Sequence, residues 1–370
     1  MKTILYLNAV GEISGAERSL LAMLAALDRG RFTPVVAAPE GGLLRAVAAL
    51  DVRTEPVALL PLRRAASIEA MWRTLSSLQC GWREISAIVN HVRPDIIHAN
   101  STPAMLFLLR VRGMPAVWHV RDLVPLGIAG PLLYKRAARV AVISSAVRGE
   151  VLRYGGGQDK SVLLQPAVDI GQFHPRDDKP ALRAGLGLPA DPPLLGMVAQ
   201  FVPWKRHHLF LDALAKLPER PWHAVLAGAD LHHDETYSTL LKHRLTTPTF
   251  AGRVSWLPWQ EDAAPLLASL DVCVLTSERE PFGRVLAEAM ACGVPAVAID
   301  DAGPRDIVAP EETGLLCPPD DLALAAAISR LLDDPGLRQR MGRAARARVE
   351  ERFSIKGQRE ALTALYEGVG

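Results

Sequence analysis

Two glutamates beside a tight turn are the residues of this sequence whose types and spacing are best suited to chemistry. The apolar run that ends at Thr276 predicts a buried strand, and the turn Pro281–Gly283 leads into a stretch that predicts a helix. The first amides of a helix have no partners within the helix, and with the helix dipole they favour binding of a phosphate. Glu280 lies just before this helix and Glu288 lies inside it. Both carboxylates can therefore face one ligand and accept hydrogen bonds from sugar or ribose hydroxyls.

Lys205 is the candidate cation of this site, because two carboxylates beside a diphosphate would otherwise repel it. It lies in the segment 199–205, just beyond the first predicted strand of the second half of the chain. Strands of one parallel sheet end at the same edge, which brings Lys205 toward the glutamates. A second interpretation stays open: beside Arg206 and His207, the lysine could belong to a solvated basic turn, and the glutamates could be a helix cap and a surface acid.

The elements that must position these residues follow an alternating pattern. Short β-branched runs alternate with longer helical patterns, which predicts βαβ units and parallel sheets covered by helices on both faces. The predicted strands are 3–9, 33–38, 96–99, 116–120, 139–143, 161–165, 194–199, 223–227, 253–257, 272–276 and 296–299. The predicted helices are 16–27, 42–50, 67–92, 103–112, 207–217, 261–270, 284–292 and 321–333.

A proline-rich, charged segment at 171–193 interrupts the alternation, and 370 residues suffice for two domains. We therefore predict an α/β protein with Rossmann-like doubly wound domains at 1–172 and 193–352, joined by a linker at 173–192. Residues 353–370 are predicted to form a C-terminal helix that packs back on the first domain. Ligands of such sheets bind beyond the carboxyl ends of the strands, so we expect the site in a cleft between the domains.

Composition excludes several classes of protein. With 49% hydrophobic and 22% charged residues the chain is neither disordered nor fibrous. The four cysteines are far apart and form no metal-ligand spacing, which disfavours a disulfide scaffold and a zinc site and favours a cytoplasmic protein. No apolar run reaches the roughly 18–20 residues of a membrane span, and the apolar start 1–7 is interpreted as a strand rather than a signal sequence. Scattered basic residues without interleaved aromatic residues argue against nucleic-acid binding.

The ordered set of motifs resembles the retaining GT-B glycosyltransferases of glycosyltransferase family 4, over nearly the whole chain. Glu280 and Glu288 form that family's Glu-x7-Glu pattern, and Lys205 falls where the family has its diphosphate-binding lysine. Gly15-Ala-Glu17 resembles its N-terminal Gly-Gly-Ala-Glu loop, with Ser14 in place of the first glycine. Further similar segments are Pro94–His98, Trp118–Asp122, Asp306 and Gly314–Asp321.

Two positions depart from the family pattern. Gln200 stands where an arginine is common, which leaves the diphosphate charge to Lys205 and backbone amides, with Arg284 as a helper. The segment Pro166–Asp169 replaces the usual Asn-Gly-Val-Asp and is interpreted as structural.

The resemblance implies a role for each residue and no cofactor or metal. As catalytic residues it implies Glu280, which would bind hydroxyls of the transferred sugar, Lys205, which would neutralise the leaving diphosphate, and His119, near the reacting carbon. Glu288 would hold the ribose, and the loop 258–261 would meet the base. The full donor-binding set is Ser14, Gly15, Gln200, Lys205, Trp259, Gln260, Glu280, Pro281, Phe282, Gly283, Arg284, Val285 and Glu288. Retention in this family needs no protein nucleophile, so catalysis would come from orientation and charge neutralisation.

The implied partners are a nucleoside-diphosphate sugar, with UDP as first and GDP as second expectation, and a hydroxyl-bearing acceptor. Lipid-linked acceptors are considered, because residues 1–175 carry 20 Lys and Arg against 13 Asp and Glu, whereas residues 176–370 carry 22 against 27. The helix 67–92 and the apolar stretch 123–134 near Lys135 and Arg136 could form a peripheral contact with the inner face of a membrane. The alternatives are a random fluctuation of surface charge and a helix stripe that faces the core.

Other functions and simpler explanations stay open. The chain could be a non-catalytic nucleotide-sugar-binding protein, which Gln200 would favour, or a GT-B nucleotide-sugar epimerase or phosphorylase. His98 and His119 could be ordinary core histidines. The segment His232–Asp234 resembles a metal cluster but lacks a third ligand at suitable spacing, so a loop is favoured there.

Overall fold

The computed structural model describes residues 1–59, 68–155, 159–230 and 234–369, with the backbone alone for residues 68–76. The chain forms two compact units. Unit 1 consists of residues 1–167 and 355–370, and unit 2 of residues 168–354. The C-terminal helix thus belongs to unit 1.

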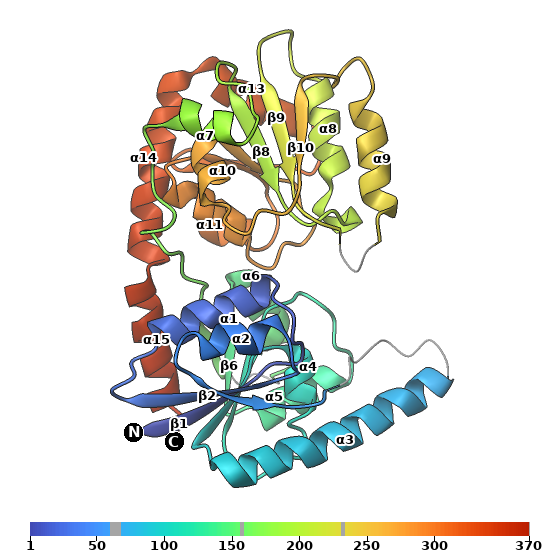
Figure 1. Ribbon diagram of the computed structural model, residues 1–370, viewed down its shortest axis with the longest axis vertical. Helices are drawn as coiled ribbons and strands as arrows, with labels where there is room; N and C mark the ends of the chain where they lie inside the picture. Colours follow the sequence, from blue (N-terminus) through green and yellow to red (C-terminus); the bar gives the residue numbers. More distant parts are fainter. Residues whose placement is uncertain (60–67, 156–158, 231–233, 370) are drawn as a thin grey trace. The chain divides into compact units, whose positions relative to one another are not determined.

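Unit 1 contains a parallel seven-stranded sheet in the order β3-β2-β1-β4-β5-β6-β7. Its strands are β1 (Lys2–Leu7), β2 (Phe32–Ala38), β3 (Arg53–Pro56), β4 (Ile96–Ala99), β5 (Ala116–Val120), β6 (Arg139–Val142) and β7 (Ser161–Leu163). Its helices are α1 (Gly15–Ala26), α2 (Gly42–Ala48), α3 (Ile68–Val92), α4 (Thr102–Leu106), α5 (Ala129–Arg136), α6 (Ser145–Leu152) and α15 (Ile355–Glu367). Figure 1 shows α15 beside α1, although the two are separated by most of the chain.

One face of this sheet is closed by α1, α2 and α15. Their apolar side chains form one buried cluster with alternate residues of the central strands, among them Leu20, Leu43 and Leu362 with Ile4 and Ile96. Tyr6 of β1 is in register with His98 of β4, so these two polar rings lie on the same covered face. The alternation of side chains along β5 brings His119 to this face as well.

The long helix α3 buries one stripe of small and apolar side chains. Ser77, Gly81, Ile85 and Val89 are buried, whereas Trp82 is partly exposed. A methyl group at Gly81 would lie 2.6 Å from the Phe107 ring, so this helix approaches its neighbour closely along the stripe. The core-facing stripe expected for this helix consists of Trp72, Leu75, Leu78, Trp82, Ile85 and Ile88. Of these, Ile85 is buried, and Leu78, Trp82 and Ile88 are partly buried. The side chains of Trp72 and Leu75 lie outside the described residues.

Unit 2 contains a parallel six-stranded sheet in the order β10-β9-β8-β11-β12-β13. Its strands are β8 (Leu194–Val198), β9 (His223–Ala227), β10 (Val254–Leu257), β11 (Val272–Leu275), β12 (Ala296–Ile299) and β13 (Gly314–Cys317). Its helices are α7 (Lys179–Gly185), the short 3-10 helix η1 (Pro203–Lys205), α8 (His207–Ala215), α9 (Thr236–Leu245), α10 (Ala264–Ser269), α11 (Arg284–Ala291), α12 (Pro304–Ile307), α13 (Asp321–Asp333) and α14 (Pro335–Arg352). The predicted class, two doubly wound α/β units with parallel sheets, is confirmed.

The core of unit 2 lies between its sheet and the helices α8 and α13. Phe210 and Leu214 of α8 and Ile328 of α13 pack in one buried cluster with the strands. On α7, buried Arg183 donates hydrogen bonds to the Ser269 carbonyl oxygen and to the Asp271 carboxylate at 2.7 Å. This part of the predicted linker 173–192 is therefore packed within unit 2.

Several predicted elements differ in extent from the observed ones. The predicted helix 103–112 ends at Leu106 in α4, and α5 begins within the apolar stretch 123–134, where no helix is predicted. The strands β3 and β13 and the helices α9 and α14 had no predicted counterpart. Short strands without β-branched alternation, such as Arg53–Pro56, give little periodic signal.

Candidate functional site

The first candidate group lies where the strands of unit 2 end. Lys205 closes the short helix η1 after β8, and Glu280 follows β11, its neighbour in the sheet. The Lys205 Nζ atom is 2.6 Å from the Glu280 Oε2 atom, and the two side chains are 14% and 10% exposed. The ammonium group also lies 4.1 Å from the centre of the Trp204 ring. Lysine has three N–H donors, so this ion pair leaves donors of Lys205 for an anion.

The backbone around Glu280 is fixed by the loop that follows β12. The amide of Arg279 donates to the Asp301 carboxylate at 2.8 Å, and the amide of Gly303 donates to the Glu280 carbonyl oxygen at 2.8 Å. A methyl group at Gly303 would lie 2.4 Å from the Phe282 backbone, so only glycine allows this approach. The position of the Glu280 carboxylate is therefore set by two loops of the sheet edge.

The helix α11 begins directly after this loop. Gly283 has a φ of 98°, a left-handed conformation that favours glycine, and turns the chain into the helix. Within the described residues, no side chain caps this helix end. Amides of its first turn, including those of Arg284 and Val285, are available to an anion. Phe282, 3% exposed, packs edge-on against Phe353 and anchors the turn.

The second glutamate pairs within the helix. The Arg284 Nε atom donates to the Glu288 Oε1 atom at 2.8 Å, and the side chains are 26% and 13% exposed. Arg284 Nη1 is buried, as is Ser277 Oγ, and neither has a hydrogen-bond partner among the described residues. Buried polar atoms of this kind are rare without a partner. Together with the helix amides they mark this edge as a site for a polar ligand. Ser277 was not predicted, although it directly follows the motif strand.

The remaining predicted donor residues of unit 2 lie after neighbouring strands. Gln200 follows β8 and is partly buried, and Pro281 lies between Glu280 and the α11 turn. Trp259, after β10, is 43% exposed, and the Gln260 side chain donates to the Pro258 carbonyl oxygen at 2.9 Å. An exposed indole ring offers a stacking surface for a planar base.

The second candidate group lies in unit 1, at the start of α1. The Glu17 carboxylate accepts hydrogen bonds from the amide and the hydroxyl of Ser14, which caps the helix. Glu17 also accepts from Asn8 Nδ2 at 3.1 Å. A methyl group at Gly15 would meet no described atom within 4 Å. Packing within the protein therefore does not require glycine at position 15.

His119 lies deeper in unit 1 than the prediction implied. It is 1% exposed, and its Nδ1 atom is 3.0 Å from His98 Nε2 and 3.3 Å from Arg121 Nη2. Burial lowers the pKa of His119 well below its usual value, and the positive charge of Arg121 lowers this pKa further. The His119 Nε2 atom is buried without a partner among the described residues. A core histidine with all of its hydrogen-bonding groups satisfied would have a partner at this nitrogen.

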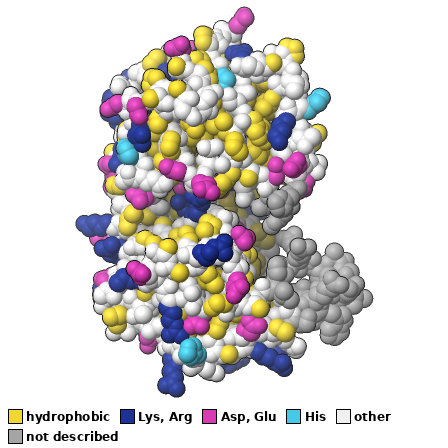
Figure 2. Space-filling view, viewed as in Figure 1, with side chains coloured by type: hydrophobic (Ala, Val, Ile, Leu, Met, Phe, Trp, Pro, Cys, Tyr) yellow, Lys and Arg dark blue, Asp and Glu magenta, His cyan; other side chains and the backbone are white. Residues whose placement is uncertain are grey.

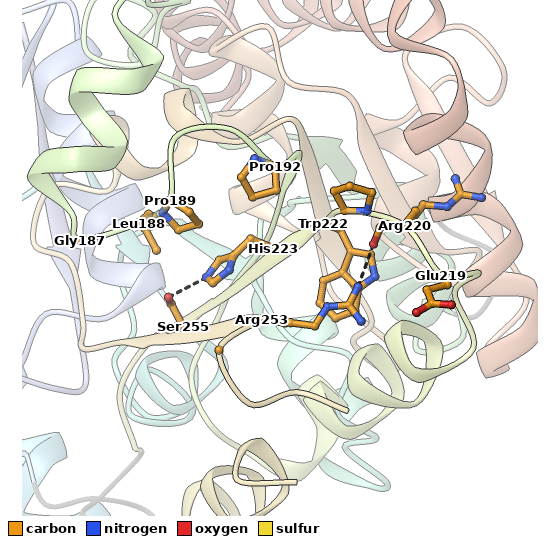
Figure 3. A pocket seen from close by; sticks show the side chains of 12 residues that line it. Gly187, Leu188, Pro189, Pro192, Glu219, Arg220, Trp222, His223, Arg253 and Ser255 are labelled. Carbon is orange, nitrogen blue, oxygen red and sulfur yellow. Dashed lines mark hydrogen bonds between the residues drawn. The ribbon is translucent and has the colours of Figure 1, made fainter. Parts of the chain in front are cut away.

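A large hollow of unit 2 lies away from these residues. It has a volume of about 1020 Å³, and Figure 3 shows the side chains that line it. They come from the segment before β8 and from the starts of β9 and β10 with the residues before them. Lys205 follows the carboxyl end of β8, so it lies at the opposite edge of this parallel sheet. Its polar groups bond one another, since His223 Nε2 is 2.8 Å from Ser255 Oγ and Arg253 donates to the Arg220 carbonyl oxygen. Arg253 also stacks over the Trp222 ring at 3.7 Å. None of the predicted donor-binding residues lines this hollow.

Two further features, a metal cluster and a helix able to span a membrane, are absent from the part of the chain that the structure describes. There, no group of three or more His, Cys, Asp and Glu side chains is arranged to hold a metal ion. No helix among these residues is both long enough and apolar enough to cross a membrane. His232 and His233 lie outside the described residues.

Two family models match the chain one after the other. The family described as "Glycosyltransferase Family 4" matches residues 13–172, and "Glycosyl transferases group 1" matches residues 178–348. The second match contains Lys205, Glu280 and Glu288, and the first contains Ser14 and His119.

Curated relatives match parts of the chain. The lipopolysaccharide core biosynthesis glycosyltransferase LpsE of Rhizobium meliloti is 34% identical over 186 residues, which are 50% of this chain and 51% of that protein. The D-inositol 3-phosphate glycosyltransferase of Kineococcus radiotolerans is 32% identical over 257 residues, 62% of this chain and 57% of that protein. The chain thus spans between half and three-fifths of the length of these relatives.

A solved structure matches the chain over its full length. The structure of HepE from Anabaena in complex with UDP-glucose has a TM-score of 0.86 and 25% sequence identity, and the match covers 99% of this chain and 100% of that one. With both family models and two parallel α/β units of this kind, the chain belongs to the GT-B glycosyltransferases of family 4.

Proposed function

We propose that this protein is a retaining glycosyltransferase that moves a sugar from a nucleoside-diphosphate sugar to a hydroxyl acceptor. The observation that carries the proposal is the largely buried Lys205–Glu280 pair beside the uncapped start of α11, within the matched family segment. A diphosphate needs positive groups and N–H donors, and a sugar needs carboxylate acceptors. This edge of unit 2 supplies all of these groups.

The donor diphosphate binds to the first amides of α11 and to the free N–H groups of Lys205. The helix dipole and the ammonium charge both favour the negative leaving group, whose charge grows as the glycosidic bond breaks. The Glu280 carboxylate, held by Lys205, accepts hydrogen bonds from hydroxyls of the transferred sugar. Glu288 accepts from the ribose hydroxyls, and Arg284, with its buried unpartnered Nη1 atom, adds a second cation near the phosphates.

The nucleotide is UDP as first and GDP as second expectation. The HepE structure contains UDP-glucose, which supports a uridine donor here. The exposed Trp259 ring and the side chain of Gln260 lie in the loop that contacts the base. The polar donors and acceptors of that loop, rather than the stacking ring, distinguish one base from another, because every base has an aromatic face.

The sugar is transferred with retention of configuration, without a protein nucleophile and without a metal ion. The Glu280 carboxylate is held in an ion pair with Lys205. In this position it orients the hydroxyls of the sugar and does not attack the anomeric carbon. The ammonium group of Lys205 and the helix amides neutralise the leaving diphosphate, which is the task that a metal ion performs elsewhere. Orientation of donor and acceptor supplies the rest of the acceleration.

The acceptor belongs to bacterial glycan, glycolipid or glycosylated-metabolite synthesis and is bound by unit 1, at a membrane surface. Ile128 and Leu132, one turn apart at the start of α5, are 91% and 57% exposed, and the exposed Lys135 follows them. Apolar side chains beside a cation suit an anionic lipid surface. Arg136 does not take part, because its guanidinium donates to the carbonyl oxygens of Leu108 and Val111.

The acidic side chains of unit 2 are mixed with basic ones on the face that Figure 2 shows. The excess of acidic residues in 176–370 therefore does not form one patch on that face.

Sedimentation with anionic vesicles at low salt tests the proposed contact between unit 1 and a membrane. We expect weaker binding of Ile128→Ser and Leu132→Ser, with Leu240→Ser of α9, 63% exposed, as control. Equal binding of all three variants would contradict the membrane contact.

The experiment that tests the proposed activity has two stages. A thermal-shift screen with UDP, GDP, ADP and dTDP identifies the nucleotide, because a ligand that binds only the folded state raises the melting temperature. The matching nucleotide sugars are then incubated with the enzyme, and proton NMR of the product shows its anomeric configuration. Retention supports the proposal and inversion contradicts it. Saturable binding without transfer or hydrolysis would instead indicate the non-catalytic binding protein.

A further inference from the structure

A chain of buried polar side chains runs across the covered face of the unit 1 sheet. The Tyr366 hydroxyl of α15 is 2.9 Å from the Tyr6 hydroxyl and 2.8 Å from His98 Nδ1. His98 Nε2 is in turn 3.0 Å from His119 Nδ1. All four side chains are at most 1% exposed. The family resemblance implies a role for His119 alone among these four side chains, so the other three need an explanation.

Arg121 sets the direction of the hydrogen bonds. Its Nη2 atom is 3.3 Å from His119 Nδ1, and a guanidinium group only donates. His119 Nδ1 must therefore accept, which means that it carries no proton. Arg121 itself is held by the carbonyl oxygen and the side chain of Asn100, at 3.0 and 2.6 Å, and by Ser19 at 3.0 Å.

The unprotonated His119 Nδ1 atom fixes the positions of the hydrogens in the other hydrogen bonds of this chain. His98 Nε2 faces the unprotonated His119 Nδ1, so it must donate, and His98 Nδ1 must then accept from the Tyr366 hydroxyl. A neutral His119 with no proton on Nδ1 carries it on Nε2, the buried atom that has no partner among the described residues.

We propose that Arg121, His98 and Tyr366 are positioning residues that hold His119 as a neutral ring with its proton on Nε2. Building on the proposed function, this N–H donates a hydrogen bond to a hydroxyl or ring oxygen of a bound sugar. The ring cannot act as a general base, because its basic nitrogen already accepts from two donors. Tyr366 belongs to the C-terminal helix α15, so this helix helps to hold His119 in one tautomer.

The charged and titratable groups that face the two rings favour the same state. They are Arg121 after β5, Tyr6 on β1 and Tyr366 on α15, and none of these carries negative charge at neutral pH. Burial, with the charge of Arg121, lowers the pKa of His98 to about 3, and burial raises the pKa of both tyrosines. Among the described residues, no acidic side chain contributes to the pKa shift of either ring, so none of them stabilises a protonated imidazole.

The test uses variants of His98 that separate its two nitrogens. The amide of Gln reaches the position of Nε2 and can still donate to His119, whereas that of Asn mimics Nδ1 and can accept only from Tyr366. Nitrogen-15 NMR of histidine-labelled protein reports which ring nitrogen carries the proton, and a His119→Asn variant assigns the signal. We expect wild type and His98→Gln to show His119 protonated on Nε2 from pH 5.5 to 8.5. His98→Asn should show a mixture of tautomers or a titration in that range.

Transfer rates give the second readout. His98→Gln should stay close to wild type, and His98→Asn should lose about tenfold or more in kcat, which corresponds to one hydrogen bond of ordinary strength. A wild-type His119 with its proton on Nδ1, or one that titrates near pH 6.5, would overturn the inference even if a variant failed to fold. Equal NMR spectra of the Gln and Asn variants would also overturn it. The predicted spectra without any transfer activity would refute the proposed function and leave the positioning of His119 intact.

Discussion

Removal of the charge on Lys205 should lower stability and activity for two separable reasons. In the free protein the Lys205 ammonium group is the ion-pair partner of Glu280, and both side chains are almost buried, at 14% and 10% exposure. Lys205→Met leaves a buried carboxylate without its cation, a change that typically costs about 3–5 kcal/mol. For a unit of this size, that loss lowers the melting temperature by roughly 6–20 °C.

The double variant Lys205→Met/Glu280→Gln distinguishes the two reasons. It removes both charges, so no buried charge is left unpaired, and most of the lost stability should return. Activity should not return, because the leaving diphosphate still lacks its cation, a loss of about 2.7–4 kcal/mol in transition-state stabilisation, or 10²–10³ in kcat.

The assay combines thermal melts of the single and double variants with initial rates on the donor found by screening. Arg305→Met is the matched control, because the Arg305–Asp300 pair is exposed at 59% and 47% and should contribute at most about 1 kcal/mol. A melting temperature of Lys205→Met equal to that of this control would refute the reasoning on burial. A double variant with near-native kcat would refute the assigned role of Lys205.

Three further predictions concern other parts of the molecule. Glu288→Ala should raise the dissociation constant of the nucleotide more than it lowers kcat, since the ribose is bound alike in the ground and transition states; titration calorimetry and initial rates check this. Initial rates should be unchanged after treatment with EDTA, and a rate restored only by a divalent cation would contradict metal-independent transfer. Acid should destabilise the fold, because the pKa of buried His98 and of buried His207 falls to about 3. The unfolded chain then binds more protons than the native one between pH 6.5 and 3. The free energy of unfolding, measured with urea, should therefore fall by up to about 1.4 kcal/mol per pH unit for each ring as the pH falls. A His207→Leu variant should show a weaker dependence of this free energy on pH.

The part of the site that is formed by adjacent segments of the chain could be predicted from the sequence. The β11 strand, the turn at Gly283 and the start of α11 are adjacent in the chain, so their order alone predicts a helix start beside a strand end. Parallel topology then predicts that Lys205, after β8, lies at the same edge. The contact between Lys205 and Glu280 agrees with that expectation, although the two residues are 75 positions apart.

The remaining features depend on packing that no local pattern records. Tyr366 and His98 are separated by 268 positions, and nothing in either segment indicates that they meet. The helix α14 has no clear apolar stripe, and the strand β3 contains proline and two charged residues, so neither gives a periodic signal. One signal was available: Asn8, Asn100 and Arg121 are polar residues directly after predicted buried strands or at their ends, where ligand-binding groups of parallel sheets gather.

The measurement that tests the central claim most directly is turnover of a nucleotide sugar by wild type and by Glu280→Gln. The substitution keeps the shape of the side chain and removes the charge that strengthens its sugar hydrogen bonds, worth about 1.5–3 kcal/mol each. We predict that wild type releases nucleoside diphosphate from the donor, and that Glu280→Gln binds the nucleotide with similar affinity but is nearly inactive. Turnover of Glu280→Gln within about a factor of two of wild type, less than the loss of one such hydrogen bond allows, would contradict the account.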